Sequence, residues 1–180
     1  MESAPQECEI VGGALCAASW GHDMRHAILA GAAALAFCIV SGAADAGPIP
    51  PGGLTLREIV HWLHDAGYKA EIQPSSEGRP NIRSAAEGTE FHIYQYDCKQ
   101  DVCGSLQFSV GFDTKGAFKS HDMNEWNRKN RWVRAFTDDV HDPWLAQDVD
   151  LTPGASYENL NDEFEIWRSS LKRFRDEVHP

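Results

Sequence analysis

Hydrophobic residues recur with helical spacing near the middle of the chain. They follow the i, i+3, i+4, i+7 pattern, which places them on one face of a helix: Leu56, Ile59, Val60 and Leu63. Thr55 and Glu58, three residues apart, have the spacing of a capping box, and Gly67 supplies a stop signal. These signals predict a helix over residues 55–66.

A longer apolar pattern lies at the C-terminal end. Its members recur at alternating spacings of 3 and 4: Tyr157, Leu160, Phe164, Trp167, Leu171, Phe174 and Val178. A sustained stripe of this kind predicts a long amphipathic helix. Three heptads can also form a coiled-coil seam, but aromatic side chains fit knobs-into-holes packing poorly and suit a sheet face. We therefore expect this helix to pack on the protein's own sheet, with a homodimer seam as the alternative.

Alternation with a period of two predicts strands between these helices. Residues 105–113 (SLQFSVGFD) alternate strictly, and residues 89–96 alternate aromatic with β-branched positions, so the two segments are typical of a half-buried antiparallel hairpin. Further segments are short candidate strands at 68–73, 81–85, 132–136 and 144–151, and a helix at 117–131. We predict an α+β fold in the order α-β-β-β-α-β-β-α, with helices on one face of an antiparallel sheet of about five strands.

The segment that begins at Met24 has the layout of a secretory signal peptide. Arg25 and His26 precede an apolar stretch at 27–40, and the small-x-small tripeptide ADA ends at Ala46. The stretch of about 14 residues is shorter than the roughly 20 that span a bilayer. We expect cleavage after Ala46, a periplasmic or secreted product and no stable membrane insertion afterwards. An uncleaved anchor or a buried core helix is the alternative.

The signal peptide divides the chain into four parts. Residues 1–23 carry acids and two cysteines ahead of the signal, so we expect translation to begin at Met24 and this part to be untranslated or a disordered extension. Residues 47–53 (GPIPPGG) are expected to form a flexible linker before a domain over 54–180. The 134 residues after Ala46 carry 22 acidic and 15 basic side chains. This acidic balance argues against nucleic-acid binding.

Two of the five cysteines, Cys98 and Cys103, follow Ala46. Four residues lie between them, so they would flank a four-residue hairpin loop and face each other on paired strands. In an oxidising compartment we expect a disulfide, whose short loop contributes only about 2 kcal/mol. A redox-active or metal-binding pair is the alternative, but the motif lacks the CxxC spacing at a helix start that lowers a thiol pKa.

Other polar groups give weaker signals for chemistry. His61 and His64 lie i, i+3 on the first predicted helix and are expected to form a solvated flank, and the acidic segment 138–142 (DDVHD) is expected to be a turn. The motifs of serine hydrolases, HExxH metalloproteases and nucleotide-binding loops do not occur in the sequence. We therefore predict no catalytic residue, no metal and no cofactor.

Three features together resemble a known family. They are the Gly67-Tyr68 pair after the first helix, the hairpin sequence FHIYQYDCKQDVCGSLQF at 91–108, and NEWN at 124–127 leading into RWVRAFTDD. This combination is similar to the YbjN family, described as bacterial sensory transduction regulators, over residues 54–178. The resemblance implies an α+β fold like that of type III secretion chaperones and a non-enzymatic role, with no catalytic set to transfer.

The resemblance leads to a functional prediction. We expect an exported binding or regulatory module that engages a protein or peptide partner in a chaperone-like manner, through a sheet face, a sheet edge or the last helix. The candidate partner-contacting residues are Asn124, Trp126, Asn127 and Trp167. The two asparagines can instead anchor their helix to a strand or helix end. An envelope redox protein or other enzyme that uses Cys98 and Cys103 is the alternative function.

Overall fold

The helices and strands follow the predicted order, with one strand more than expected before the second helix. The computed structural model describes residues 47–74 and 78–179. Within these residues the helices are α1 (Leu56–Asp65), α2 (Ser120–Lys129) and α3 (Tyr157–Val178). The strands are β1 (Ala70–Gln73), β2 (Asn81–Ala86), β3 (Thr89–Lys99), β4 (Val102–Gly111), β5 (Arg134–Thr137) and β6 (Pro143–Asp150). The extension predicted at 1–23 and the signal peptide predicted at 24–46 lie outside the described residues.

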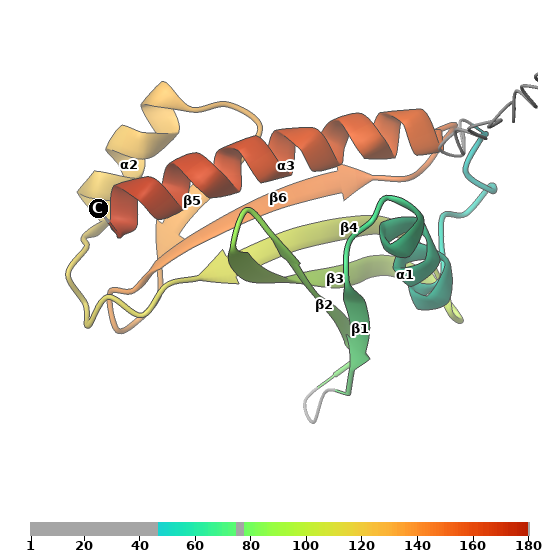
Figure 1. The fold of residues 1–180 in the computed structure, drawn as a ribbon, viewed down its shortest axis with the longest axis horizontal. Helices are drawn as coiled ribbons and strands as arrows, with labels where there is room; N and C mark the ends of the chain where they lie inside the picture. The colour runs from blue at the N-terminus through green and yellow to red at the C-terminus, as the bar shows by residue number, and fades with distance from the viewer. Residues whose placement is uncertain (1–46, 75–77, 180) are drawn as a thin grey trace, which may run out of the picture. The chain divides into compact units, whose positions relative to one another are not determined.

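The strands form one antiparallel sheet in the order β1-β2-β3-β4-β6-β5 (Figure 1). This arrangement confirms the α+β class. The sheet has six strands rather than about five, because both short segments after α1 pair with each other through Ala70↔Ser84 and Ile72↔Ile82. The β2–β3 turn places Glu87 at φ 53° and the following glycine at φ 76°, as a two-residue hairpin turn of the primed type requires.

Helix α3 packs its apolar stripe against the sheet. Its buried residues are Leu160, Phe164, Trp167, Ser170, Leu171, Phe174 and Val178. At the centre, the Trp167 ring stacks on Phe108 of β4 at 5.6 Å between centroids and meets Phe91 of β3 edge-on at 5.5 Å. The stripe therefore packs on the protein's own sheet, as the aromatic composition predicts.

The two shorter helices lie at opposite ends of α3 (Figure 1). Helix α1 begins with the predicted capping box, in which Thr55 accepts from the backbone of Glu58 and Glu58 accepts from the backbone of Thr55. Helix α2 carries Met123 and Trp126 toward the core. In the described part of the chain, no helix combines the length and apolar character needed to cross a membrane.

The segment at 47–53 is held in place by the rest of the domain, whereas its composition predicts a flexible linker. Ile49 is 5% exposed, and its N–H donates to the carbonyl of Ala155 at 2.9 Å. Leu54 exchanges two backbone hydrogen bonds with Cys103. A Cβ on Gly53 would lie 1.9 Å from the Cys103 oxygen, so this close approach requires glycine. Proline and glycine predict turns here, but the contacts depend on distant residues.

Candidate binding site at the sheet edge

Strand β5 forms one edge of the sheet, and a side chain closes this edge. The side chain of Asn127 on α2 accepts from the N–H of Ala135 at 2.8 Å and donates to the carbonyl of the same residue at 2.9 Å. Both backbone groups of Ala135 that face away from β6 are therefore satisfied as they would be by another strand. Covering an edge in this way blocks pairing with other chains.

Strand β1 forms the opposite edge. In an antiparallel ladder, the backbone groups of successive residues point alternately toward the two sides. The outward N–H and carbonyl of Ala135 fix this alternation for the whole sheet, because the register connects β5 to β1 through β6, β4, β3 and β2. On β1, the backbone groups of Ala70 and Ile72 therefore point away from β2. His64 Nε2 lies 3.1 Å from the carbonyl oxygen of Ala70 and covers that position. His64, predicted as part of a solvated flank, thus contacts the strand edge.

Ile72 lies two residues further along β1, and its edge is open. Among residues 47–74 and 78–179, no side chain bonds to its outward N–H or carbonyl. Its side chain is 43% exposed, so an apolar group is accessible beside these backbone groups. The outward backbone groups and the exposed side chain together make β1 the available edge of the sheet.

A cleft of about 510 Å³ lies beside this edge. It is bounded by the start of α1, the end of β1 and the tip of the β3–β4 hairpin, and its lining residues are Thr55, Leu56, Arg57, Ile72, Arg79, Pro80, Gln95 and Asp101. Its volume falls within the range of natural ligand pockets. The exposed side chain of Ile72 therefore contributes to the wall of a preformed cleft.

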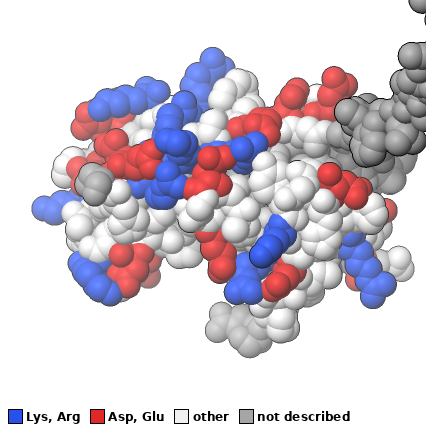
Figure 2. All heavy atoms as spheres, viewed as in Figure 1, with Lys and Arg blue, Asp and Glu red and all other residues white. Residues whose placement is uncertain are grey.

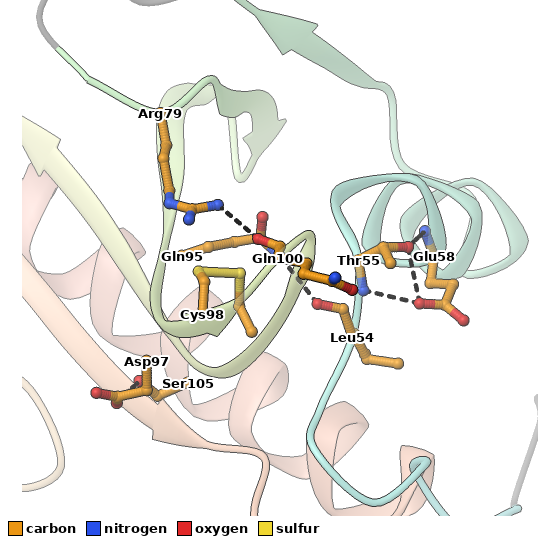
Figure 3. Close-up of a disulfide and its surroundings, with 10 residues drawn as sticks. Leu54, Thr55, Glu58, Arg79, Gln95, Asp97, Cys98, Gln100 and Ser105 are labelled. Carbon is orange, nitrogen blue, oxygen red and sulfur yellow. Dashed lines mark hydrogen bonds between the residues drawn. A yellow bond between two sulfur atoms is a disulfide. The ribbon is translucent and has the colours of Figure 1, made fainter.

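Hydrogen bonds hold the polar walls of the cleft in place (Figure 3). Arg79 Nη1 donates to the carbonyl of Gln100 at the hairpin tip at 2.9 Å. Gln95 Nε2 donates to the carbonyl of Leu54 at 3.0 Å, immediately before the capping box of α1. Each wall is thus tied to another element, so the cleft is formed before any partner binds.

The charges around the cleft are predominantly positive. Arg57 and Arg79 line it together with one acid, Asp101. The first turn of α1 adds the partial positive charge of a helix N-terminus, which the capping carboxylate of Glu58 offsets in part. A carboxylate is therefore the side-chain group that this cleft favours.

The predicted disulfide joins Cys98 and Cys103 at the hairpin that ends beside the cleft. The two cysteines are direct partners in the ladder, and so are Lys99 and Val102, which leaves a two-residue turn instead of the predicted four-residue loop. Cys103 is 0% exposed. Cys98 is partly exposed, but the burial of Cys103 and the pairing of both residues in the strand ladder favour a structural role for the bond.

The structure separates the residues predicted to contact a partner. Trp167 is 0% exposed in the core, so it is not available to a partner, in contrast to the prediction. Trp126 is 8% exposed and meets Phe174 edge-on at 5.0 Å. Asn127 anchors α2 to β5, which agrees with the alternative prediction that the asparagines anchor their helix to a strand. Asn124 is exposed.

The acidic segment 138–142 forms the turn between β5 and β6. Asp138 accepts hydrogen bonds from the backbone N–H groups of Val140 and Asp142 and from the indole N–H of Trp144. Asp142 accepts from Thr114 and from the backbone N–H of Gly116. The pKa of the Asp138 carboxyl is lowered, chiefly by the hydrogen bond from the backbone N–H of Asp142. The pKa of the Asp142 carboxyl is also lowered, chiefly by the hydrogen bond from the backbone N–H of Gly116.

These two carboxylates predict an acid-sensitive stability. A lowered pKa in the folded state means that their contribution is present above the unfolded value of about 4 and is lost as the pH falls toward the folded value. We expect the melting temperature to fall on acidification below about pH 4, and Asp142→Asn to reduce this dependence. Thermal unfolding from pH 7 to pH 3 measures it, with Asp139→Asn in the same turn as control. An unchanged pH profile in Asp142→Asn would contradict the prediction.

The fold and the site define the molecule as an α+β domain in which the β1 edge, open among the described residues, borders a preformed polar cleft. The model of the YbjN family, described as "Putative bacterial sensory transduction regulator", matches residues 55–180. The chain belongs to the YbjN family, as the hairpin and helix motifs indicate. Comparison with curated proteins and with solved structures found no match. The family description is one of regulation rather than catalysis.

Proposed function

We propose that this protein is a non-enzymatic regulatory module that binds an extended segment of a partner protein by adding it to the sheet beside β1. One observation carries the proposal: the outward N–H and carbonyl of Ile72 lie on an edge that the described residues leave open, whereas Asn127 closes the opposite edge. Main-chain hydrogen bonds to such an edge supply affinity without specifying a sequence.

The cleft supplies the specificity in this proposal. A partner residue directly opposite Ile72 has its side chain on the same face of the extended sheet, which is the side where Ile72 lines the cleft. Arg57 and Arg79 then favour an acidic side chain at that position. The partner segment that we propose is therefore an extended strand with an aspartate or glutamate opposite Ile72.

The signal-peptide layout at 24–46 supports export as part of the same proposal. An oxidising compartment is also where a disulfide such as Cys98–Cys103 persists. The partner that we propose is accordingly a periplasmic or secreted protein.

The variant Ile72→Pro tests the strand-addition site. Proline at position 72 removes the outward N–H but leaves the hydrogen bonds between β1 and β2 intact. The edge strand therefore tolerates the proline, whereas a partner strand can no longer pair with β1 there. Peptides are selected from a displayed random library on the immobilised wild-type protein, and their affinities are measured by calorimetry. We expect Ile72→Pro to weaken binding about tenfold or more, because a main-chain hydrogen bond is lost and a clash is introduced.

Two further variants serve as comparisons in this experiment. Ile72→Val preserves the backbone groups and is expected to bind within about twofold of the wild type. Arg57→Glu reverses one charge of the cleft. This variant is therefore expected to bind more weakly those peptides that carry an acidic residue opposite Ile72. Selected peptides that bind Ile72→Pro as tightly as the wild type, or a library that yields no binder, would contradict the proposal.

A further inference from the structure

Trp132, between α2 and β5, has an unusual conformation and an unusual exposure. Its backbone lies at φ 74°, a region that a bulky residue adopts only under strain, and its side chain is 64% exposed. The next residue, Val133, is 8% exposed and anchors the chain in the core. The exposed indole gains little from burial that could offset the cost of the strained backbone. Packing within the domain therefore does not explain why a tryptophan occupies this position.

Basic residues surround this tryptophan. Residues 126–137 (WNRKNRWVRAFT) contain four cations and no acid in a chain of net charge −11. Lys129 pairs with Glu125 at 2.8 Å, and Arg134 approaches Asp148 at 3.7 Å. Within residues 47–74 and 78–179, Arg128 and Arg131 form no ion pair with an acidic side chain. The guanidinium of Arg131 instead lies over the Trp132 ring, 4.7 Å from its centroid.

The helix terminus explains only part of this cluster. Arg128 and Lys129 lie in the last turn of α2, where cations interact favourably with the helix dipole. Arg131 and Trp132 follow the helix, so this reason does not apply to them. In Figure 2, basic side chains stand out over α2 and the segment that follows it, with acidic side chains among them. The segment 128–132 thus presents an exposed indole beside cations, on a molecule whose overall charge is negative.

We propose that segment 128–132 binds peripherally to an anionic lipid surface. Indole rings partition to the membrane–water interface because they combine an apolar body with a polar N–H. Arginine binds phosphate groups bidentately, and cations near an anionic leaflet gain attraction that salt screens. Nucleic acid fits less well, since four cations neutralise few phosphates along a polyanion. The inference does not depend on the strand-addition site.

Co-sedimentation of the full chain with lipid vesicles tests this proposal. Vesicles of phosphatidylglycerol mixed with phosphatidylcholine are compared with vesicles of phosphatidylcholine alone. We expect the wild type to bind the anionic vesicles more strongly, and the difference to vanish at high salt. Arg128→Gln/Arg131→Gln is expected to lower partitioning about fivefold for each charge removed. Trp132→Ala is expected to lower it as well, and to remove the fluorescence change of an indole that enters the interface.

Controls at the other end of α3 and on the sheet make the result specific. Lys69→Gln removes an exposed cation between α1 and β1, and Tyr96→Ala removes an aromatic side chain that is 48% exposed. Both variants are expected to bind the vesicles like the wild type. Every variant carries the apolar stretch at 27–40, so the differences between variants come from the substituted residues and not from that stretch. Equal binding to neutral and anionic vesicles, or unchanged binding by both test variants, would overturn the proposal.

Discussion

Replacing Trp167 by alanine is expected to destabilise the domain by about 3–5 kcal/mol, the range for deleting a buried aromatic side chain. The indole is 0% exposed and contacts the rings of both Phe91 and Phe108. Its removal takes away one of the two aromatic side chains, with Phe164, that join the middle of α3 to the rings of β3 and β4. Surrounding side chains on a helix and a sheet relax only partly into such a cavity.

Urea unfolding at several protein concentrations measures this effect. Trp132→Ala provides the matched control, since it removes the same side chain from an exposed position and is expected to change the free energy of unfolding by less than about 0.5 kcal/mol. The midpoint of the wild type is expected not to depend on protein concentration. A concentration-dependent midpoint, or a Trp167→Ala cost below about 1 kcal/mol, would contradict the packing of α3 on its own sheet.

The sequence predicts those parts of the fold that depend on local periodicity. The spacing of Phe164, Trp167 and Leu171 determines which face of α3 is buried, and strict alternation over 105–113 does the same for β4. Strand order and hairpin length depend on pairing between segments. For this reason the sequence predicts a four-residue loop between Cys98 and Cys103, whereas their neighbours Lys99 and Val102 also pair and shorten it.

The candidate site depends even more on distant contacts. Arg57 and Arg79 are 22 residues apart in sequence, and only the pairing of β1 with β2 brings both to one cleft. Nothing in the local sequence marks Ile72 as an edge residue, because its alternation is the same in a central strand. The best available indication of an edge strand is the short length of β1, which has four residues, because natural sheets often have short edge strands. A sequence pattern predicts which face a side chain occupies but not which strand lies outermost.

Replacing Asn127 by alanine is expected to cost about 2–6 kcal/mol, since it leaves two backbone groups of Ala135 without partners and each unsatisfied buried group costs about 1–3 kcal/mol. Ala135 is 5% exposed, so water reaches these groups poorly. Chemical unfolding measures the loss, and Asn124→Ala is the matched control, because it is the same substitution one turn earlier on α2 at an exposed site. We expect that control to change stability by less than about 0.5 kcal/mol.

Asn127→Ala also tests the reasoning behind the strand-addition proposal. If an unoccupied edge is sufficient to recruit an extended chain, opening the β5 edge creates a second place for strand pairing. Sedimentation at increasing concentration is then expected to show self-association of Asn127→Ala but not of Asn124→Ala. An Asn127→Ala protein that is as stable and as monomeric as its control would mean that β5 needs no cover. The contrast between the two edges would then no longer support β1 as the binding edge.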